Sequence, residues 1–239
     1  MAELDASTEK TVTVTGDKQA GVSDERLQFW AVALAIAGCV ALALSPLVMM
    51  ADRAISAAVR GGPMPGDLRK AIELSEAFAH GSGVAVILLA LLLVCSRPRK
   101  AIWTVILMTA VSGITATLLK AVFVRARPYT YDTQAELVTD VTGWQFLGSR
   151  SFWDASQRSF PSGHTATAWG LAIGLSLLLP RGRILFVFLA LMATYQRLYS
   201  GAHFPSDTLA GFGVALLICG LILFIPRLRQ SLVESSSSP

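Results

Sequence analysis

Six long apolar blocks, separated by short polar connectors, make up most of the chain. They lie at 29–51, 77–96, 101–122, 162–179, 184–200 and 207–225, and very few charged residues interrupt them. A membrane span needs about 20 consecutive apolar residues. Blocks 162–179 and 184–200 are shorter, so we expect their ends to extend into the flanking residues. The pattern predicts six transmembrane segments.

These segments are predicted to be helices. No water is available inside a bilayer, so every backbone N–H and C=O must find its partner within the protein. The strands of a membrane barrel would alternate apolar and polar residues, whereas these blocks are continuously apolar. We therefore predict an all-α fold, a bundle of six transmembrane helices.

Composition and charge agree with a membrane protein. Hydrophobic residues make up 53% of the 239 residues and charged residues 15%, with a mean hydropathy of +0.56. The formal net charge of +4 could suit a nucleic-acid partner. However, the basic residues lie in short clusters between apolar blocks, as in loops at a membrane surface. We predict a membrane-bound chain without a nucleic-acid partner, and the pattern leaves its oligomeric state open.

The basic connectors determine the predicted orientation. Connectors 97–100, 181–183 and 227–229 contain arginine or lysine and no acid, and six spans place them on one side with both termini. The positive-inside rule makes that side cytoplasmic. The polar first 26 residues show no cleavable signal peptide, which suits a multi-pass protein of a bacterial inner membrane. We expect one membrane domain at 27–226 between two cytoplasmic tails, 1–26 and 227–239. Disorder is expected in residues 1–26 and in the closing serine run, Ser235–Ser238.

Three clusters of polar residues interrupt the apolar blocks, all on the predicted extracytoplasmic side. Ionisable groups at membrane depth are costly and indicate function. In the first cluster, Lys120 and Arg127 are seven positions apart. This spacing places them on one helix face, about 10 Å apart along the axis, where both can reach one anion. Pro128 should end the helix. A basic helix end that contacts lipid headgroups is the alternative, and such a contact is expected for Arg125, which lies off this face.

The second cluster opens the fourth block. Pro161 and Ser162 fit a helix start, where free N–H groups and the helix dipole favour an anion. Gly163 allows an oxygen-rich ligand to approach the backbone, and His164 can give or take a proton. An ordinary helix cap would explain Ser162 but neither Gly163 nor His164.

The third cluster lies between the last two blocks. His203 and Asp207 are four positions apart, which can bring the carboxylate to one imidazole nitrogen. That contact would fix the tautomer and leave the other nitrogen as a nucleophile. Arg197 adds a forked donor for phosphate oxygens. A structural His–Asp pair at a helix start is the alternative.

In order along the chain, these clusters resemble the signature of the type 2 phosphatidic acid phosphatase superfamily. That signature is Lys-x6-Arg-Pro, then Pro-Ser-Gly-His, then Ser-Arg-x5-His-x3-Asp. The motifs cover residues 120–207, and the six-helix plan extends the resemblance to about 27–225. One position departs from the signature, because Gln196 stands where the family has the serine before the third-motif arginine. We expect this departure to affect the substrate more than the mechanism.

The resemblance implies a phosphatase that works without a metal. In the family, the third-motif histidine attacks phosphorus and forms a phosphohistidine. The second-motif histidine protonates the leaving oxygen, and the acid orients the nucleophile. These roles fall on His203, His164 and Asp207, in that order. Three cations around one phosphoryl group would supply the charge neutralisation that Mg²⁺ supplies elsewhere. The implied phosphate pocket consists of Lys120, Arg127, Arg197, Ser162 and Gly163.

A pocket at the extracytoplasmic ends of the helices lies at the depth of lipid headgroups. We therefore predict hydrolysis of a lipid phosphate monoester or a polyprenyl diphosphate, which is phosphoric monoester or acid anhydride hydrolase chemistry. Phosphatidate, phosphatidylglycerol phosphate, polyprenyl diphosphate and lipid A phosphates would present a similar group. A vanadate-dependent haloperoxidase would share the anion pocket, but the spans disfavour it.

Two other functions remain possible from the sequence. A lipid phosphotransferase would use the same histidine chemistry with a different acceptor. A non-catalytic protein that binds lipid headgroups would need the cations, but not an oriented nucleophile such as His203 with Asp207.

No metal or cofactor is predicted. The three histidines do not belong to a tight cluster with cysteine or glutamate, and His80, at a span edge, is expected to be structural. Three cysteines lie inside apolar blocks and are expected in the core or against lipid: Cys39, Cys95 and Cys219.

Two extracytoplasmic connectors carry further patterns. Around Leu68, Ile72 and Leu74, connector 52–76 has the amphipathic character of a helix on the membrane surface. Loop 128–161 is rich in aromatic residues, which either fold over the pocket and select the substrate or anchor the loop at the interface. These residues are Tyr129, Tyr131, Trp144, Phe146, Phe152 and Trp153.

Overall fold

The computed structural model describes residues 23–60, 62–131, 144–146 and 154–237. Each of the six apolar blocks forms a helix, and the fold is mostly helical, as predicted. These helices are α1 (Asp24–Met49), α4 (Gly81–Val94), α5 (Arg99–Val122), α7 (Gly163–Leu178), α8 (Arg183–Tyr199) and α9 (Pro205–Phe224).

The number of membrane spans is confirmed only in part. Within the described ranges, α1, α5 and α9 are each long and apolar enough to cross a membrane. The helical segment 66–78 together with α4, bent by 67° at a short break, would give a fourth span. Helices α7 and α8 have 16 and 17 residues, which is short for a span. Six spans therefore stay a prediction.

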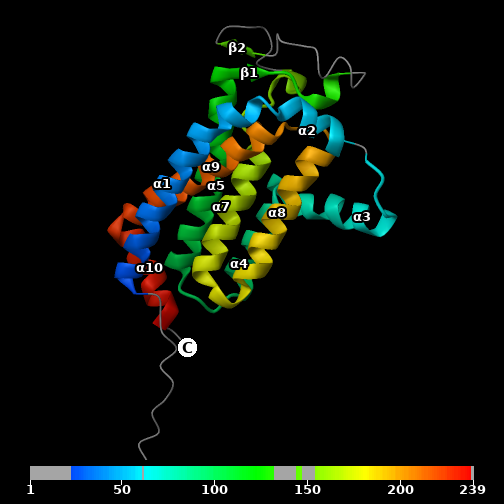
Figure 1. Cartoon of the computed structure of the whole chain (residues 1–239). Coiled ribbons are helices and arrows are strands. Elements are labelled where there is room, and N and C mark those ends of the chain that lie inside the picture. The colour runs from blue at the N-terminus through cyan, green and yellow to red at the C-terminus, as the bar shows by residue number, and fades with distance from the viewer. Residues whose placement is uncertain (1–22, 61, 132–143, 147–153, 238–239) are drawn as a thin grey trace, which may run out of the picture.

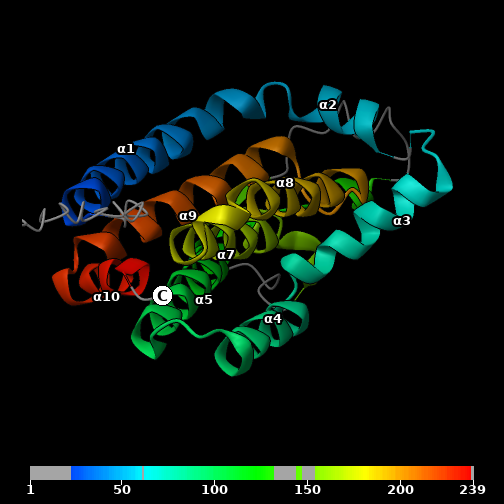
Figure 2. The same cartoon turned by 90° about the horizontal axis from the view of Figure 1, so that it is seen from below.

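Helix α7 lies at the centre of the bundle. It packs against α5, α8 and α9, and α1 runs along the outer side of α9 (Figures 1 and 2). One apolar core extends through these helices and includes Met108 of α5, Leu171 of α7 and Leu223 of α9. Of the cysteines, Cys219 is buried in this core and Cys39 is exposed on α1, as expected for core and lipid-facing positions.

Glycines allow two close approaches of α9. A Cβ at Gly38 of α1 would lie 2.5 Å from the backbone nitrogen of Leu217, so α1 can lie against α9 only without a side chain there. A Cβ at Gly211 would lie 2.4 Å from the carbonyl oxygen of Ser162. The start of α7 therefore sits directly against α9, and this contact brings the second and third polar clusters together.

The remaining elements form the connectors. Connector 52–78 folds into α2 (Asp52–Val59), α3 (Gly66–Leu74) and the 3-10 helix η1 (Ser75–Phe78). The predicted amphipathic helix corresponds to α3, in which Ile72 is buried and Leu68 and Leu74 are exposed. After α5, strand β1 (Phe123–Arg125) pairs antiparallel with β2 (Trp144–Phe146). The short turns of 3-10 helix are η2 (Pro128–Thr130), η4 (Ala155–Gln157) and η5 (Pro180–Gly182).

The prediction of a disordered serine run at the C-terminus was wrong for Ser235–Ser237, which the structure describes. Pro226–Ser237 forms helix α10, which packs against α5, α7 and α9. Leu232 is 1% exposed, and Arg229 Nε donates to Asp24 Oδ1 over 2.7 Å. The Ser235 hydroxyl donates to the carbonyl of Leu232. The serine-rich composition hid one buried apolar position and an ion pair to α1. The first predicted tail lies almost wholly in residues 1–22, outside the described residues.

The two ends of the bundle differ. Helix α10 and the C-terminus lie at one end, whereas α2, β1 and β2 lie at the other (Figure 1). The end of α5, the start of α7 and the turn between α8 and α9 all lie at the β1–β2 end. The three polar clusters therefore meet at the end of the bundle opposite α10, while its extracytoplasmic location stays a prediction.

Candidate active site

The first cluster converges as expected, although not along a helix face. Lys120 Nζ donates to the carbonyl of Arg158 over 3.0 Å, and Arg127 Nη2 donates to the same oxygen over 3.5 Å. However, α5 ends at Val122 and β1 follows, so Arg127 is extended, with φ −87° and ψ 152°. The strand, rather than helical periodicity, carries Arg127 back beside Lys120.

The second cluster forms the start of α7. The Ser162 hydroxyl accepts hydrogen bonds from the N–H of Thr165 over 3.3 Å and from its hydroxyl over 2.9 Å. Ser162 therefore caps the helix, which was the alternative interpretation for this residue. A Cβ on Gly163 would lie 3.8 Å from both Lys120 Cε and Thr117 Oγ1. A larger side chain at this position would occupy the space beside Lys120.

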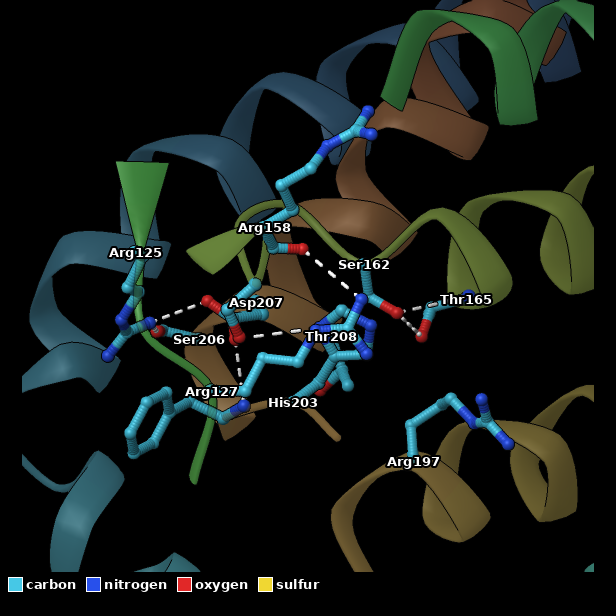
Figure 3. Close-up of polar contacts among 12 residues, drawn as sticks. Arg125, Arg127, Arg158, Ser162, Thr165, Arg197, His203, Ser206, Asp207 and Thr208 are labelled. Atoms are coloured by element: carbon cyan, nitrogen blue, oxygen red, sulfur yellow. Dashed lines mark hydrogen bonds and ion pairs between the residues drawn. The ribbon is translucent and has the colours of Figure 1, made fainter. Parts of the chain in front are cut away.

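The third cluster contains a buried histidine–carboxylate pair. His203 is 1% exposed and Asp207 is fully buried. Asp207 Oδ2 faces Nδ1 of His203 at 3.7 Å (Figure 3), slightly longer than a hydrogen bond. The same oxygen accepts from the Ser159 hydroxyl over 2.5 Å and from the N–H of Phe204 over 2.8 Å. The carboxylate is thus held on the Nδ1 side of the ring.

Burial keeps the ring of His203 uncharged. Burial, with a smaller contribution from the charge of Lys120, lowers the pKa of His203 to about 4 against the opposing effect of Asp207. At neutral pH the ring is therefore a neutral imidazole, the form that can act as a nucleophile.

Arg125 does not contact lipid headgroups, and this prediction was wrong. Its side chain is buried, because β1 turns it inward (Figure 3). Arg125 Nη1 donates to Asp207 Oδ1 over 2.6 Å, and Nη2 donates to Asp52 Oδ2 over 2.7 Å. Asp52, the first residue of α2, also accepts from the N–H of Ser206 over 2.8 Å. Arg125 therefore joins two buried carboxylates and fixes the catalytic candidate Asp207 from behind.

Arg197 and His164 meet at a residue that the sequence did not single out. Glu76 Oε1 lies 2.7 Å from Arg197 Nη2 and 3.7 Å from His164 Nε2. Glu76 belongs to η1, more than forty positions before the first motif, so no local spacing could have indicated it. His80 caps α4 through its ring nitrogen, as expected for a structural residue, and its ring lies 5.8 Å from that of His164.

A cavity of about 630 Å³ opens beside these residues. Its polar end is formed by Lys120, Arg127, Gly163 and His164, and the rest runs between α4 and α5. Apolar side chains such as Val84 and Leu88 of α4 and Ile114 of α5 line that part. The cavity can accept an anion at one end and an apolar chain along its length.

No cluster of three or more metal-ligating side chains is found within residues 23–60, 62–131, 144–146 and 154–237. Of the aromatic loop residues, Phe152 and Trp153 lie outside the described residues. Tyr129 is described, and its N–H donates to the carbonyl of Gly201 over 3.0 Å. A selective role for the loop stays a prediction.

The sequence model of the PAP2 superfamily, the type 2 phosphatidic acid phosphatases, matches residues 101–230. This stretch contains all three clusters. The chain belongs to this superfamily. It is similar to the lipid A 1-phosphatases of Rhizobium etli (37% identity over 42% of this chain and 39% of that protein) and Rhizobium johnstonii (35% identity over 47% and 43%). It is also similar to the undecaprenyl-diphosphatase of Sulfolobus acidocaldarius (27% identity over 52% and 54%).

The match is partial in both directions. The chain spans about two fifths of the length of the two lipid A 1-phosphatases. No solved structure matches the chain.

Proposed function

We propose that this protein hydrolyses a phosphate monoester or diphosphate of a membrane lipid through a phosphohistidine intermediate. One observation carries the proposal: a buried, neutral His203 faces Asp207 on one side and lies among the cations of the motif residues. These cations, Lys120, Arg127 and Arg197, come from separate elements, and Arg127 and Arg197 both act electrostatically on Lys120. Family membership and the names of the curated relatives support the same chemistry.

In the first step, Nε2 of His203 attacks phosphorus, because Asp207 faces Nδ1. The N–P bond forms as the bond between phosphorus and the lipid oxygen breaks. The imidazolium of His164 gives one proton to that oxygen, so the lipid leaves as an alcohol, or as a phosphate if the substrate is a diphosphate. Asp207 stabilises the positive charge that the ring of His203 acquires.

In the second step, water replaces the lipid. The neutral His164 takes a proton from water, oxygen attacks phosphorus, and the N–P bond breaks. Inorganic phosphate leaves, His203 returns to its neutral form and His164 is again an imidazolium. Lys120, Arg127 and Arg197 stabilise the charge that develops on the phosphoryl oxygens in both steps.

The cavity supports a lipid as the substrate. A phosphate beside Lys120 would place the first carbons of a lipid chain between α4 and α5, against Val84, Leu88 and Ile114. The inner membrane location and the extracytoplasmic orientation of the site belong to this proposal, and the basic connectors support the orientation.

Narrowing the cavity is expected to discriminate against long chains. Ala85 lines the cavity and is exposed, whereas Ala90, one turn further along α4, is exposed but does not line it. In Ala85→Phe, the larger side chain should displace about two methylenes of the lipid chain from the cavity, at about 0.8 kcal/mol each. We therefore expect kcat/KM for a long-chain lipid phosphate to fall about tenfold. Kinetics with long-chain and short-chain phosphates test this. Ala90→Phe is the matched control, and an equal loss in both variants would contradict a lipid chain in this cavity.

Phosphate release by detergent-purified protein tests the proposed function. We expect release in the presence of EDTA from at least one of four lipids: phosphatidate, phosphatidylglycerol phosphate, a polyprenyl diphosphate or a phosphorylated lipid A. A phosphorylated lipid or sugar in place of free phosphate would instead indicate a phosphotransferase. Binding of these lipids without any turnover would indicate a headgroup-binding protein, and loss of release with EDTA would contradict the metal-free mechanism.

A further inference from the structure

A third acidic residue of the site, Glu76, lies between Arg197 and His164. Its Oε1 is 2.7 Å from Nη2 of Arg197 and 3.7 Å from Nε2 of His164. Its other oxygen, Oε2, accepts from Nε2 of Gln196 over 3.4 Å. The carboxylate is thus held on both oxygens and directed at the imidazole that faces the cavity.

The segment that carries Glu76 is anchored in the bundle. Phe78 is 5% exposed and belongs to the main apolar core. The Ser75 hydroxyl donates to the carbonyl of Ile72 over 2.6 Å, and η1 packs against α8 and α4. Glu76 therefore has a defined place next to α8, although residues 101–230 alone carry the family match.

Gln196 completes this arrangement. Its side-chain oxygen accepts from Nε of Arg197, and its amide nitrogen donates to Glu76. A serine at this position, as in the family signature, is too short to make both contacts. The departure from the signature and the position of Glu76 are therefore linked.

We propose that Glu76 is a positioning residue for the general acid, and that it supports His164 as Asp207 supports His203. The inference rests on the proposed function. His164 must carry a proton when the lipid oxygen leaves, yet it lies among cations that disfavour its charged form. A carboxylate 3.7 Å from Nε2, slightly beyond hydrogen-bond distance, stabilises the imidazolium and favours the ring orientation that faces it. The proton still passes from His164 to the leaving oxygen, and Glu76 exchanges none.

The ion pair between Arg197 and Glu76 leaves Arg197 able to bind phosphate. The contacts with Glu76 and Gln196 use Nη2 and Nε of the guanidinium. A guanidinium has five N–H donors, so others are available to a phosphate oxygen. If Glu76 were instead a competitor for the phosphate position on Arg197, removing its charge would strengthen substrate binding. The two roles thus predict opposite results.

The dependence on the leaving group tests the proposal. Glu76→Gln is compared with wild type on an alkyl phosphate and on a nitrophenyl phosphate that carries the same alkyl chain. An alkoxide needs a proton to leave, whereas a nitrophenolate does not. General acid catalysis contributes about 10² to 10⁴, so we expect kcat/KM to fall about 100-fold for the alkyl ester and less than about threefold for the nitrophenyl ester. The parameter kcat/KM reports formation of the phosphohistidine.

Glu73→Gln is the matched control. It removes a carboxylate three positions away, which pairs with Arg69 on the exposed surface of α3, and should leave both substrates unaffected. Glu76→Asp, which keeps the charge, should recover part of the loss on the alkyl ester. If Glu76→Gln does not fold, Gln196→Met serves in its place. It removes the hydrogen bond from Gln196 to Glu76 Oε2 but keeps the glutamate itself, and the same selective loss on the alkyl ester is expected.

The pH profile provides a second readout. As pH rises, His164 loses the proton that it must donate, and activity on the alkyl ester declines. This decline should begin at a lower pH in Glu76→Gln than in wild type, because the imidazolium is less stable without the carboxylate. Glu73→Gln should not show this change. Besides Glu76, the charged and titratable groups that face His164 are His80, Lys120, Arg197 and His203.

The outcomes separate the proposal from the proposed function. An equal loss on both esters, or a gain in phosphate affinity, would overturn the role of Glu76 while leaving the phosphatase intact. If wild type releases phosphate from neither ester nor from the lipids, the proposed function fails, and the role of Glu76 fails with it.

Discussion

Replacing His203 with alanine is expected to abolish phosphate release, with kcat lowered by a factor on the order of 10⁴ or more, as when a covalent nucleophile is removed. The cations and His164 would remain, but water would have to attack the lipid phosphate directly. The measurement is phosphate release from the preferred lipid, together with trapping of the phosphoenzyme by rapid quenching with labelled substrate. A phosphohistidine survives alkali and is lost in acid, so the label on wild type should show this pattern and be absent from the variant.

The buried position of His203 requires a folding control. Because its ring is 1% exposed, alanine leaves a space next to Asp207. His203→Gln fills most of this space and should be equally inactive. Both variants should elute as wild type does in detergent and should still bind inorganic phosphate, which the cations hold without a covalent bond to the nucleophile. Label that persists in either variant would place the covalent intermediate on another residue.

The apolar pattern predicted the helices well because the bilayer leaves few alternatives. Predicted block 207–225 corresponds to α9 at Pro205–Phe224, and 101–122 to α5 at Arg99–Val122. Backbone groups must pair locally in lipid, so a long apolar run determines both the element and its approximate ends. The pattern was less reliable for block 77–96, where α4 starts only at Gly81 after a 3-10 turn.

The catalytic candidates were predictable because their chemistry is local in sequence. His203 and Asp207 lie within four residues, and Ser162, Gly163 and His164 are consecutive. Their supporting residues were not predictable in the same way. Asp52 and Glu76 reach the site only through the folding of connector 52–78. Asp52 and Glu76 are each more than seventy positions from their partners, Arg125 and Arg197. A spacing of this length does not indicate a contact.

Arg125 shows how a wrong local assumption changes the role of a residue. Counting positions along a helix placed it off the Lys120 face and toward lipid headgroups. The helix ends at Val122, and three residues of strand turn Arg125 inward onto Asp207. A β-branched and aromatic stretch, Phe123 and Val124, was the available signal for that change, since such residues favour strands.

Replacing Arg125 with methionine should be strongly destabilising. The guanidinium lies between Asp52 and Asp207, and all three side chains are almost fully buried. Removing one partner of a buried ion pair leaves an uncompensated charge and costs about 3–5 kcal/mol. The free energy of unfolding in detergent should therefore fall by about this amount. Activity should fall as well, because Asp207 loses the donor that holds it behind His203. Chemical unfolding and phosphate release measure the two effects.

Two comparisons isolate the buried charge as the cause. Arg69→Met breaks an exposed ion pair with Glu73, and such surface pairs are worth about 0–1 kcal/mol, so its stability should stay close to wild type. Combining Arg125→Met with Asp52→Asn removes one of the two orphaned carboxylates, and it should recover stability but not activity, because Asp207 still lacks its arginine. A double variant no more stable than Arg125→Met would show that packing of the arginine, rather than its charge, stabilises this end of the bundle. Recovery of activity in the double variant would mean that Arg125 acts on Asp52 alone, and that Ser159 and the Phe204 backbone suffice to hold Asp207 against His203.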